Sequence, residues 1–216
     1  MPTATERATT DALLTAHGQT YAQEVGVRLR DTPQPLYQVL VLAHLLSARI
    51  RASVAMDAAR ALFDDGMRSP RRMSEATWQQ RVDALGKGHY RRYDERTATQ
   101  LGEAADQLLE RYDGDLRKLR EAADGDVGTC RHLLRELPGI GPTGADIFLR
   151  EVQAVWPETA PYFDAKALQG AERLGLPTAP ESLARLVGED AYPALAAGLV
   201  RSALDKDVAD DVSTRV

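Results

Sequence analysis

The chain has a single cysteine, Cys130, among its 216 residues. One thiol excludes an internal disulfide framework, and it excludes a zinc or iron–sulfur site built from four cysteines of this chain. Long apolar runs are also missing, since none approaches the roughly eighteen residues of a membrane span. The first twenty residues carry charges where a signal peptide would be apolar. We therefore expect a cytoplasmic protein that is neither exported nor embedded in a membrane.

Aromatic residues are scarce, with three Phe and two Trp, and alternating Val, Ile and Thr residues are few. Alanine and leucine are abundant instead, and this balance favours helix over strand. At 44% hydrophobic and 27% charged, the composition excludes a disordered or collagen-like chain. The sequence predicts an all-α fold. Apolar spacing and breaker residues place helices at 11–30, 36–50, 53–63, 74–85, 95–112, 129–137, 143–155, 164–175, 182–187 and 192–204.

The sequence also predicts where the core helix lies, which residues cap two helices, and how the chain ends. The segment 36–50 is apolar nearly all round, so it is expected to be central and buried. Ser53 and Ser74 are expected to cap the helices that they open. The acidic tail from Asp205 is expected to fray.

The formal net charge of −5 argues mildly against a nucleic-acid partner, but the charges are unevenly distributed. Between Arg68 and Arg96 eight basic residues stand against four acids, and from Leu101 to Asp126 the balance is reversed. A protein with one basic and one acidic face would show this pattern. Ordinary solvated helix surfaces would show it as well.

The sequence Leu-Pro-Gly-Ile-Gly at 137–141 separates two predicted helices. Glycines at Gly139 and Gly141 permit backbone conformations closed to other residues and let a foreign backbone approach closely. Ile140 is placed to fill the gap between the helices, and Pro142 suits a first helical turn. The free amides of that turn would bind a phosphate without sequence preference. The simpler interpretation is a tight helical hairpin that uses glycine only for its geometry.

This segment, with Ala145 after it, resembles the helix-hairpin-helix of the endonuclease III-like (HhH-GPD) base-excision DNA glycosylases. In that family an essential aspartate opens a helix about twenty residues after the hairpin, and Asp164 in Phe-Asp-Ala-Lys occupies this place. The sequence Leu-Leu-Ser-Ala-Arg at 45–49 is similar to the end of the family's buried helix. The resemblance implies two helical lobes with DNA bound in a cleft between them. It assigns residues 33–157 to a six-helix bundle, and 1–32 with 158–216 to the lobe carrying the aspartate.

The resemblance implies hydrolysis of an N-glycosidic bond, with Asp164 stabilising the cationic sugar and orienting water. A helix N-cap is the ordinary role for such an aspartate. Family members that also cleave the strand carry a lysine where this chain has Thr143, which points to a monofunctional enzyme. Lys166 is an alternative nucleophile, and a solvent-facing or phosphate-contacting lysine is its simpler interpretation.

The chain departs from the family pattern in other places. It lacks the four C-terminal cysteines of an iron–sulfur cluster, so no such cofactor is expected. Gly144 replaces Thr or Ser, and Arg49 replaces the glutamine that enters the space of a flipped nucleotide. Arg49 could fill that space, contact a phosphate, or simply end a helix. The resemblance further implies a monovalent cation at the hairpin carbonyls near Leu137 and Ile140, with no side-chain metal ligand.

These observations predict a monomeric, nucleoid-associated DNA glycosylase acting on duplex DNA with a damaged, mispaired or abasic site. The proposed DNA contacts are Pro138, Gly139, Ile140, Gly141, Thr143, Gly144 and Arg49, and the proposed catalytic residues are Asp164 and Lys166. A non-catalytic DNA-binding protein and a bifunctional lyase using Lys166 are the alternatives. His44 lies on the apolar helix, either as a core residue or in a pocket wall.

Overall fold

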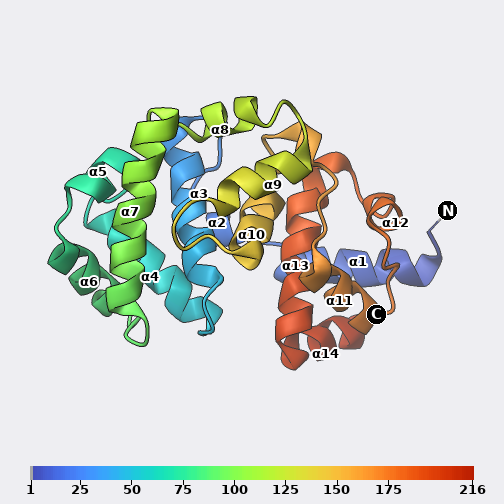
Figure 1. Ribbon diagram of the computed structural model, residues 1–216. Helices are drawn as coiled ribbons and strands as arrows, with labels where there is room; N and C mark the ends of the chain where they lie inside the picture. Colours follow the sequence, from blue (N-terminus) through green and yellow to red (C-terminus); the bar gives the residue numbers. More distant parts are fainter. Residues whose placement is uncertain (1) are drawn as a thin grey trace. The chain divides into compact units, whose positions relative to one another are not determined.

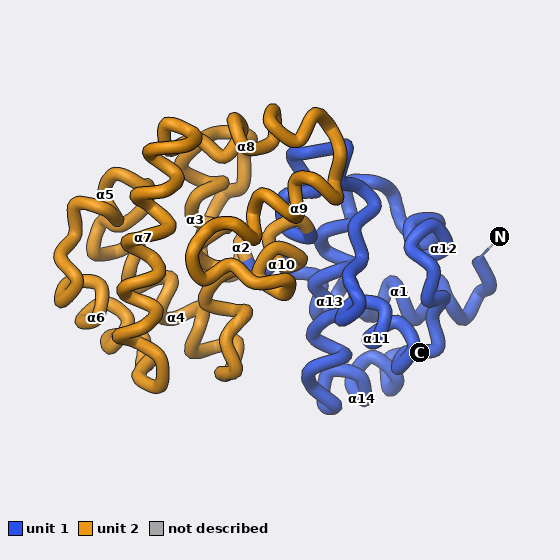
Figure 2. Tube along the Cα trace, in the orientation of Figure 1, with its two compact units in different colours: residues 1–21, 150–216 blue, residues 22–149 orange. Residues whose placement is uncertain are grey.

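The computed structural model describes residues 2–216. Over that range every regular element is a helix and no strand occurs, which confirms the all-α prediction. The chain divides into two compact units (Figure 2). Unit 1 is formed by the two ends of the chain, up to Tyr21 and from Arg150 onward, and unit 2 by residues 22–149.

The boundaries of the units differ from the ranges that the resemblance implied. Unit 2 begins eleven residues before position 33 and ends eight residues before position 157. The second boundary falls inside a helix, α10 (Pro142–Val152), where no turn or breaker residue marks it. Contacts between distant segments define such a boundary, and the local sequence carries no sign of it.

Unit 2 contains the helices of the middle of the chain, residues 22–149 (Figure 1). In chain order these are α2 (Tyr21–Glu24), α3 (Pro33–Leu46), α4 (Ala52–Asp64), α5 (Pro70–Glu75), α6 (Trp78–Lys87), α7 (Asp94–Tyr112), α8 (Leu116–Ala122), α9 (Val127–Arg135) and the larger part of α10.

Helix α3 is the buried helix of unit 2. Its residues from Leu36 to Leu45 are buried except Gln38, and it contacts α4 and α8. The prediction of a central helix is therefore confirmed, although the helix ends at Leu46 and not at position 50. Arg49 consequently lies beyond the last turn, on an exposed bend.

The single helix predicted at 74–85 is two helices, α5 and α6. Ser69 caps the first and Thr77 the second, each accepting a hydrogen bond from the amide three residues on. Ser74 lies inside α5, where its hydroxyl donates to Asp106 of α7, so the predicted cap is wrong. Ser53 is likewise inside its helix, because α4 begins at Ala52 without a side-chain cap.

Unit 1 contains α1 (Ala4–His17), the 3₁₀ turns η1 (Pro157–Thr159) and η2 (Glu189–Ala191), and the helices α11 (Ala165–Arg173), α12 (Pro180–Ala184), α13 (Tyr192–Leu204) and α14 (Lys206–Thr214). Helices α11 and α13 pack closely at Gly170, where a Cβ atom would lie 1.8 Å from the carbonyl oxygen of Leu199. No side chain larger than hydrogen fits at that crossing.

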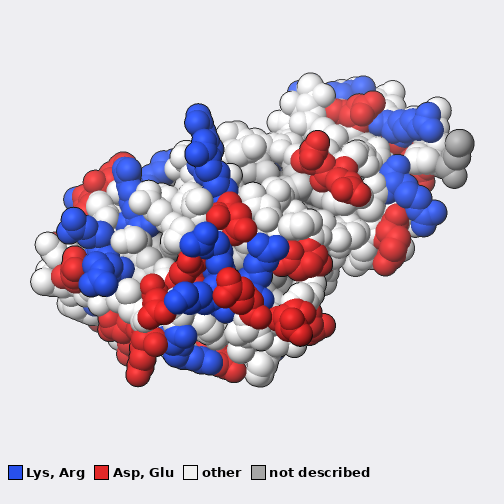
Figure 3. All heavy atoms as spheres, turned by 90° about the horizontal axis from the view of Figure 1, so that it is seen from above, with Lys and Arg blue, Asp and Glu red and all other residues white. Residues whose placement is uncertain are grey.

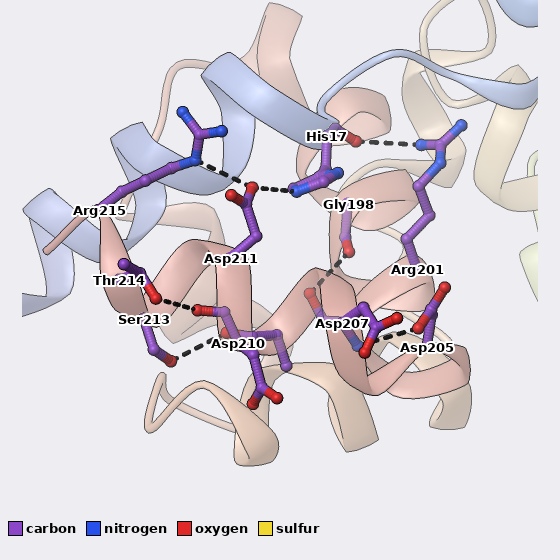
Figure 4. Close-up of polar contacts among 12 residues, drawn as sticks. His17, Gly198, Arg201, Asp205, Asp207, Asp210, Asp211, Ser213, Thr214 and Arg215 are labelled. Carbon is purple, nitrogen blue, oxygen red and sulfur yellow. Dashed lines mark hydrogen bonds and ion pairs between the residues drawn. The ribbon is translucent and has the colours of Figure 1, made fainter.

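The two ends of the chain are joined by polar contacts in unit 1 (Figure 4). Nε2 of His17, in the last turn of α1, lies 2.8 Å from Oδ2 of Asp211 on α14. Arg215 contacts the same oxygen through Nε at 2.9 Å. Arg201 of α13 donates to the backbone oxygen of His17 at 3.0 Å. The tail was expected to fray, but it forms α14 with Val212 fully buried, so that expectation is wrong.

The first predicted helix, at 11–30, is also wrong in its limits. Helix α1 ends at His17, and Gly18 follows it as C-cap with its amide donating to the oxygen of Leu14 at 3.1 Å. The short α2 follows at Tyr21. Glycine after the last turn commonly ends a helix. It does so here although apolar residues continue beyond it at a spacing that suits a longer helix.

Candidate functional site

Helices α9 and α10 are joined by a tight turn at Leu-Pro-Gly-Ile. The amide of Ile140 donates to the carbonyl oxygen of Leu137 at 3.0 Å, and Gly139 has a φ of +80°. Proline at the second position and a left-handed glycine at the third define a type II turn. Leu137 and Ile140 are both buried, as expected for residues that fill the space between the two helices.

The two hairpin glycines have different structural roles. At Gly139 the positive φ requires glycine, and a Cβ atom would lie 2.3 Å from Cε1 of His44. At Gly141 the φ is not positive, and a Cβ atom would meet nothing within 4 Å. The expectation that both glycines adopt conformations closed to other residues therefore applies to Gly139 only. Gly141 leaves open space in front of the backbone, which permits the close approach of a ligand.

The first turn of α10 presents free backbone donors. The oxygen of Gly141 accepts the first helical hydrogen bond, from the amide of Ala145 at 3.0 Å. Within the described residues, the amides of Gly141, Thr143 and Gly144 donate to no protein group. Pro142 has no amide proton. Gly141 and Thr143 are exposed, so an anion could approach this end of the helix dipole from solvent.

A cavity of about 740 Å³ lies beside the turn, entirely within unit 2. This volume is in the range of small-molecule pockets in proteins. Its wall is formed by the C-terminal part of α3 and the bend after it, by the start of α7, and by the hairpin. The lining residues that bear on function are His44, Arg49, Tyr93, Arg96, Gln100, Arg135 and residues 137–141.

His44 is both a core residue and part of the cavity wall. It is 6% exposed, and burial lowers the pKa of its imidazole to about 4, with the charge of Arg96 acting in the same direction. A hydrogen bond with the side chain of Gln100 opposes this shift. The ring is therefore neutral at pH 7.

Three arginines of the cavity wall have no acidic partner. Arg49, Arg96 and Arg135 are exposed, and none forms an ion pair within the described chain. The one acidic residue of the wall, Glu136, is occupied by Arg111 at 2.6 Å. Other basic residues of unit 2 are paired with carboxylates, among them Arg60, Arg68, Arg72, Lys87, Arg117, Lys118, Arg120 and Arg131. The cavity wall beside the hairpin therefore carries three arginines whose charge no carboxylate of the described residues neutralises.

Four of the eight basic residues between Arg68 and Arg96 are bonded to neighbouring groups. Arg68, Arg72 and Lys87 are ion-paired, and Arg81 donates to the carbonyl oxygens of Met73 and Ala76. On the face shown in Figure 3, blue and red side chains are interspersed. Of the two interpretations of the charge pattern, that face fits solvated helix surfaces.

Asp164 is the N-cap of α11, as its position in the sequence predicted. Oδ1 accepts a hydrogen bond from the amide of Ala167 at 2.8 Å. Oδ2 lies 2.6 Å from Nη1 of Arg150, which belongs to the same unit. The two side chains are 8% and 3% exposed. Both carboxylate oxygens thus have a protein partner, and the negative charge is balanced by a buried guanidinium.

Sequence analysis did not identify Arg150 as a site residue. The available signal was a charged pair, Arg150 and Glu151, directly after the apolar run at 147–149 in a helix whose next residue, Val152, is also buried. Charged residues are almost never fully buried without a partner. Nε of Arg150 is buried with no hydrogen-bond partner, so its guanidinium is only partly satisfied.

Of the other candidate positions, Lys166 and Thr143 are exposed and Gly144 is buried. The amine of Lys166 donates to Oε1 of Gln169 at 2.7 Å on the exposed surface of α11. Thr143, at the place of the family's lysine, is exposed, and Gly144 has room for a Cβ atom at 3.5 Å from Cγ2 of Ile140. The carbonyl of Leu137, implied as a cation ligand, already accepts one hydrogen bond and retains a second lone pair.

The described residues include neither a metal-binding cluster nor a membrane-spanning helix. No group of three or more His, Cys, Asp or Glu side chains in residues 2–216 is arranged to hold a metal ion. In the same range no helix combines the length and the apolar character that a bilayer crossing requires.

Comparison with solved structures completes the description of the site. A non-covalent endonuclease III–DNA complex matches 84% of this chain and 79% of its own, with a TM-score of 0.51 and 16% identity. The fold is that of endonuclease III. A trapped endonuclease III–DNA covalent intermediate, described as an estranged-adenine complex, covers 93% of this chain and 86% of its own at a TM-score of 0.49 and 16% identity. No family model and no curated protein matches the sequence. At this identity the endonuclease III fold is shared, and the function must be argued from the site.

Proposed function

We propose that this protein is a base-excision DNA glycosylase that holds DNA through the hairpin of unit 2. The observation that carries the proposal is the cavity beside the hairpin, whose wall includes Gly141 with its free amide and three arginines without acidic partners. Amides at a helix N-terminus and arginine guanidinium groups are the donors that bind phosphate. Contacts of this kind position a protein on DNA without reading its sequence.

The proposed chemistry uses Asp164 as a fixed carboxylate. Water forms a bond to the anomeric carbon of deoxyribose while the bond to the base nitrogen breaks, and the base leaves with the electron pair and takes up a proton. The proton lost by the water passes to the carboxylate or to solvent. Negative charge close to the sugar stabilises the cationic transition state. Each oxygen of Asp164 makes one hydrogen bond in the structure, so each retains a lone pair for the water.

A second candidate function is DNA binding without catalysis, and the Arg150–Asp164 ion pair is the observation that favours it. The guanidinium 2.6 Å from Oδ2 offsets the negative charge that would stabilise the sugar. At 8% exposure the carboxylate also has little access to solvent. Asp164 would then act only as the cap of α11, tied to α10 by Arg150.

The two functions are separated by a base-release assay on duplexes that each carry one defined lesion, mismatch or abasic site. For a glycosylase we expect release of one free base, and a loss of at least about a hundredfold in Asp164→Asn because the charge is removed. Asparagine keeps the acceptor for the amide of Ala167, so the helix cap is preserved. Unchanged release in this variant would refute the catalytic role. DNA binding with no release from any duplex would establish the second candidate.

A bifunctional lyase through Lys166 is tested separately. Its amine would have to leave Gln169 and attack the sugar, forming a Schiff base with loss of water. Borohydride reduction in the presence of abasic-site DNA would trap that adduct. Because the amine is exposed and already bonded along its own helix, we expect no adduct. An adduct that disappears in Lys166→Ala would show the lyase.

A further inference from the structure

The hairpin turn rests on two side chains whose chemistry the proposed function does not use. A Cβ atom built on Gly139 would lie 2.3 Å from Cε1 and 2.5 Å from Nε2 of His44, and 3.1 Å from Cβ of Gln100. The turn therefore packs in direct contact with a residue of α3 and a residue of α7. The side chain of Gln100 also interacts with the imidazole of His44 and acts to raise its pKa.

We propose that the His44–Gln100 pair is a positioning element that fixes the Gly139 turn, and with it the free amides of α10, for contact with DNA. This inference rests on the proposed DNA binding by the hairpin. The left-handed backbone at Gly139 is held on one side by the Ile140–Leu137 hydrogen bond and on the other by the imidazole. His44 and Gln100 thus lie where a side chain at position 139 would otherwise be.

The chemistry of the pair suits a positioning role better than a contact with phosphate. The imidazole is 6% exposed and neutral at pH 7, so it offers no charge to a polyanion. A neutral ring gives one donor and one acceptor, so it can pair with the side-chain amide of Gln100. Phosphate attraction falls instead to the exposed arginines of the cavity wall.

A double-mutant cycle tests the coupling between His44 and Gly139. DNA dissociation constants are measured by fluorescence anisotropy for wild type, His44→Ala, Gly139→Ala and the double variant, at a temperature where thermal melts show each protein folded. We expect His44→Ala to weaken binding about tenfold and Gly139→Ala about a hundredfold. The double variant should bind more tightly than Gly139→Ala, because the methyl group enters the space left by the ring. Additive losses would overturn the proposal.

Two further variants separate positioning from general stability. His44→Gln keeps a neutral hydrogen-bonding group for Gln100, so we expect its affinity within about threefold of wild type. Leu42→Ala removes a fully buried side chain of α3 that does not line the cavity, so it should lower stability and leave affinity unchanged. Affinity that falls with stability in both Leu42→Ala and His44→Ala would contradict a specific role.

The salt dependence provides the remaining readout. Because His44 carries no charge, His44→Ala should weaken binding without changing the slope of log K against log salt. A reduced slope would identify His44 as a phosphate contact and overturn the positioning role. If Gly139→Ala does not fold alone, a folded double variant supports the proposal and an unfolded one contradicts it. Absence of DNA binding by the wild type would refute the proposed function itself, whereas binding with an additive cycle refutes only this inference.

Discussion

At the scale of single residues, the two glycines of the hairpin are there for different physical reasons. Gly139 is required by its left-handed backbone and by the imidazole packed against it. Gly141 is required by neither, because the space in front of it is empty. The open space in front of Gly141 leaves room for an incoming group. A substitution at Gly141 should therefore affect binding with little loss of stability, whereas one at Gly139 should affect both.

We predict that Gly141→Ala weakens DNA binding about tenfold, since the methyl group occupies the approach to the amides of α10. Its loss of stability should be below about 1 kcal/mol, the cost of alanine in place of glycine at an N-cap. Gly139→Ala should lose more stability, about 1–3 kcal/mol, through backbone strain and steric overlap. Urea denaturation and anisotropy measure the two quantities. Unchanged affinity in Gly141→Ala would remove the amides from the proposed interface.

The residue scale also shows what the sequence could not predict. The position of Asp164 at the start of a helix followed from its neighbours, and the N-cap is confirmed. Its partner Arg150 lies fourteen residues earlier on another helix, and only the packing of α10 and α11 brings the two together. Likewise, nothing local to His44 or Gln100 indicates that both would touch Gly139. Motifs of contiguous residues were predictable, whereas pairs across helices were not.

At the scale of elements, long periodic segments were predicted best. Helix α13 has the predicted limits, and α7 begins one residue before its predicted start. Their apolar positions recur at helical spacing over many turns. Shorter elements were missed or merged: α8 was not predicted, and α5 and α6 were taken as one helix. Six or seven residues hold fewer than two helical turns, too little for a period to show, and tertiary packing fixes them instead.

Helix α14 supports a prediction at this scale. Hydrogen bonds from Arg215, and next from His17, lower the pKa of Asp211 below its ordinary value of 3.8 (Figure 4). A carboxyl with a lowered pKa in the folded state stabilises the protein above pH 3.8, and this contribution is lost as the pH falls through the folded pKa. Asp211→Asn should therefore lower the urea midpoint at pH 7, with a difference from wild type that shrinks below pH 3.8. If the difference in urea midpoint does not change with pH, the ionised carboxylate of Asp211 does not stabilise the protein.

At the scale of the whole molecule, the net charge of −5 has to be reconciled with a polyanionic ligand. Pairing of acids and bases reduces the conflict in unit 2, because many carboxylates there form ion pairs with basic neighbours, while Arg49, Arg96 and Arg135 beside the hairpin form none within the described residues. The local field at the cavity, rather than the net charge, then directs association. Overall repulsion should still keep the affinity moderate.

If the cavity wall is the interface, we predict a shallow salt dependence set by its three arginines, Arg49, Arg96 and Arg135. If each contacts one phosphate, the slope of log K against log salt is about −3. Arg49→Ala, Arg96→Ala or Arg135→Ala should each reduce its magnitude by about 1. Arg117→Ala is the matched control, because Arg117 is already paired with Asp115 at 2.6 Å and is not part of the cavity wall. If Arg117→Ala and Arg135→Ala change the slope equally, DNA binding depends on the net charge of the molecule. The cavity would then not be the interface.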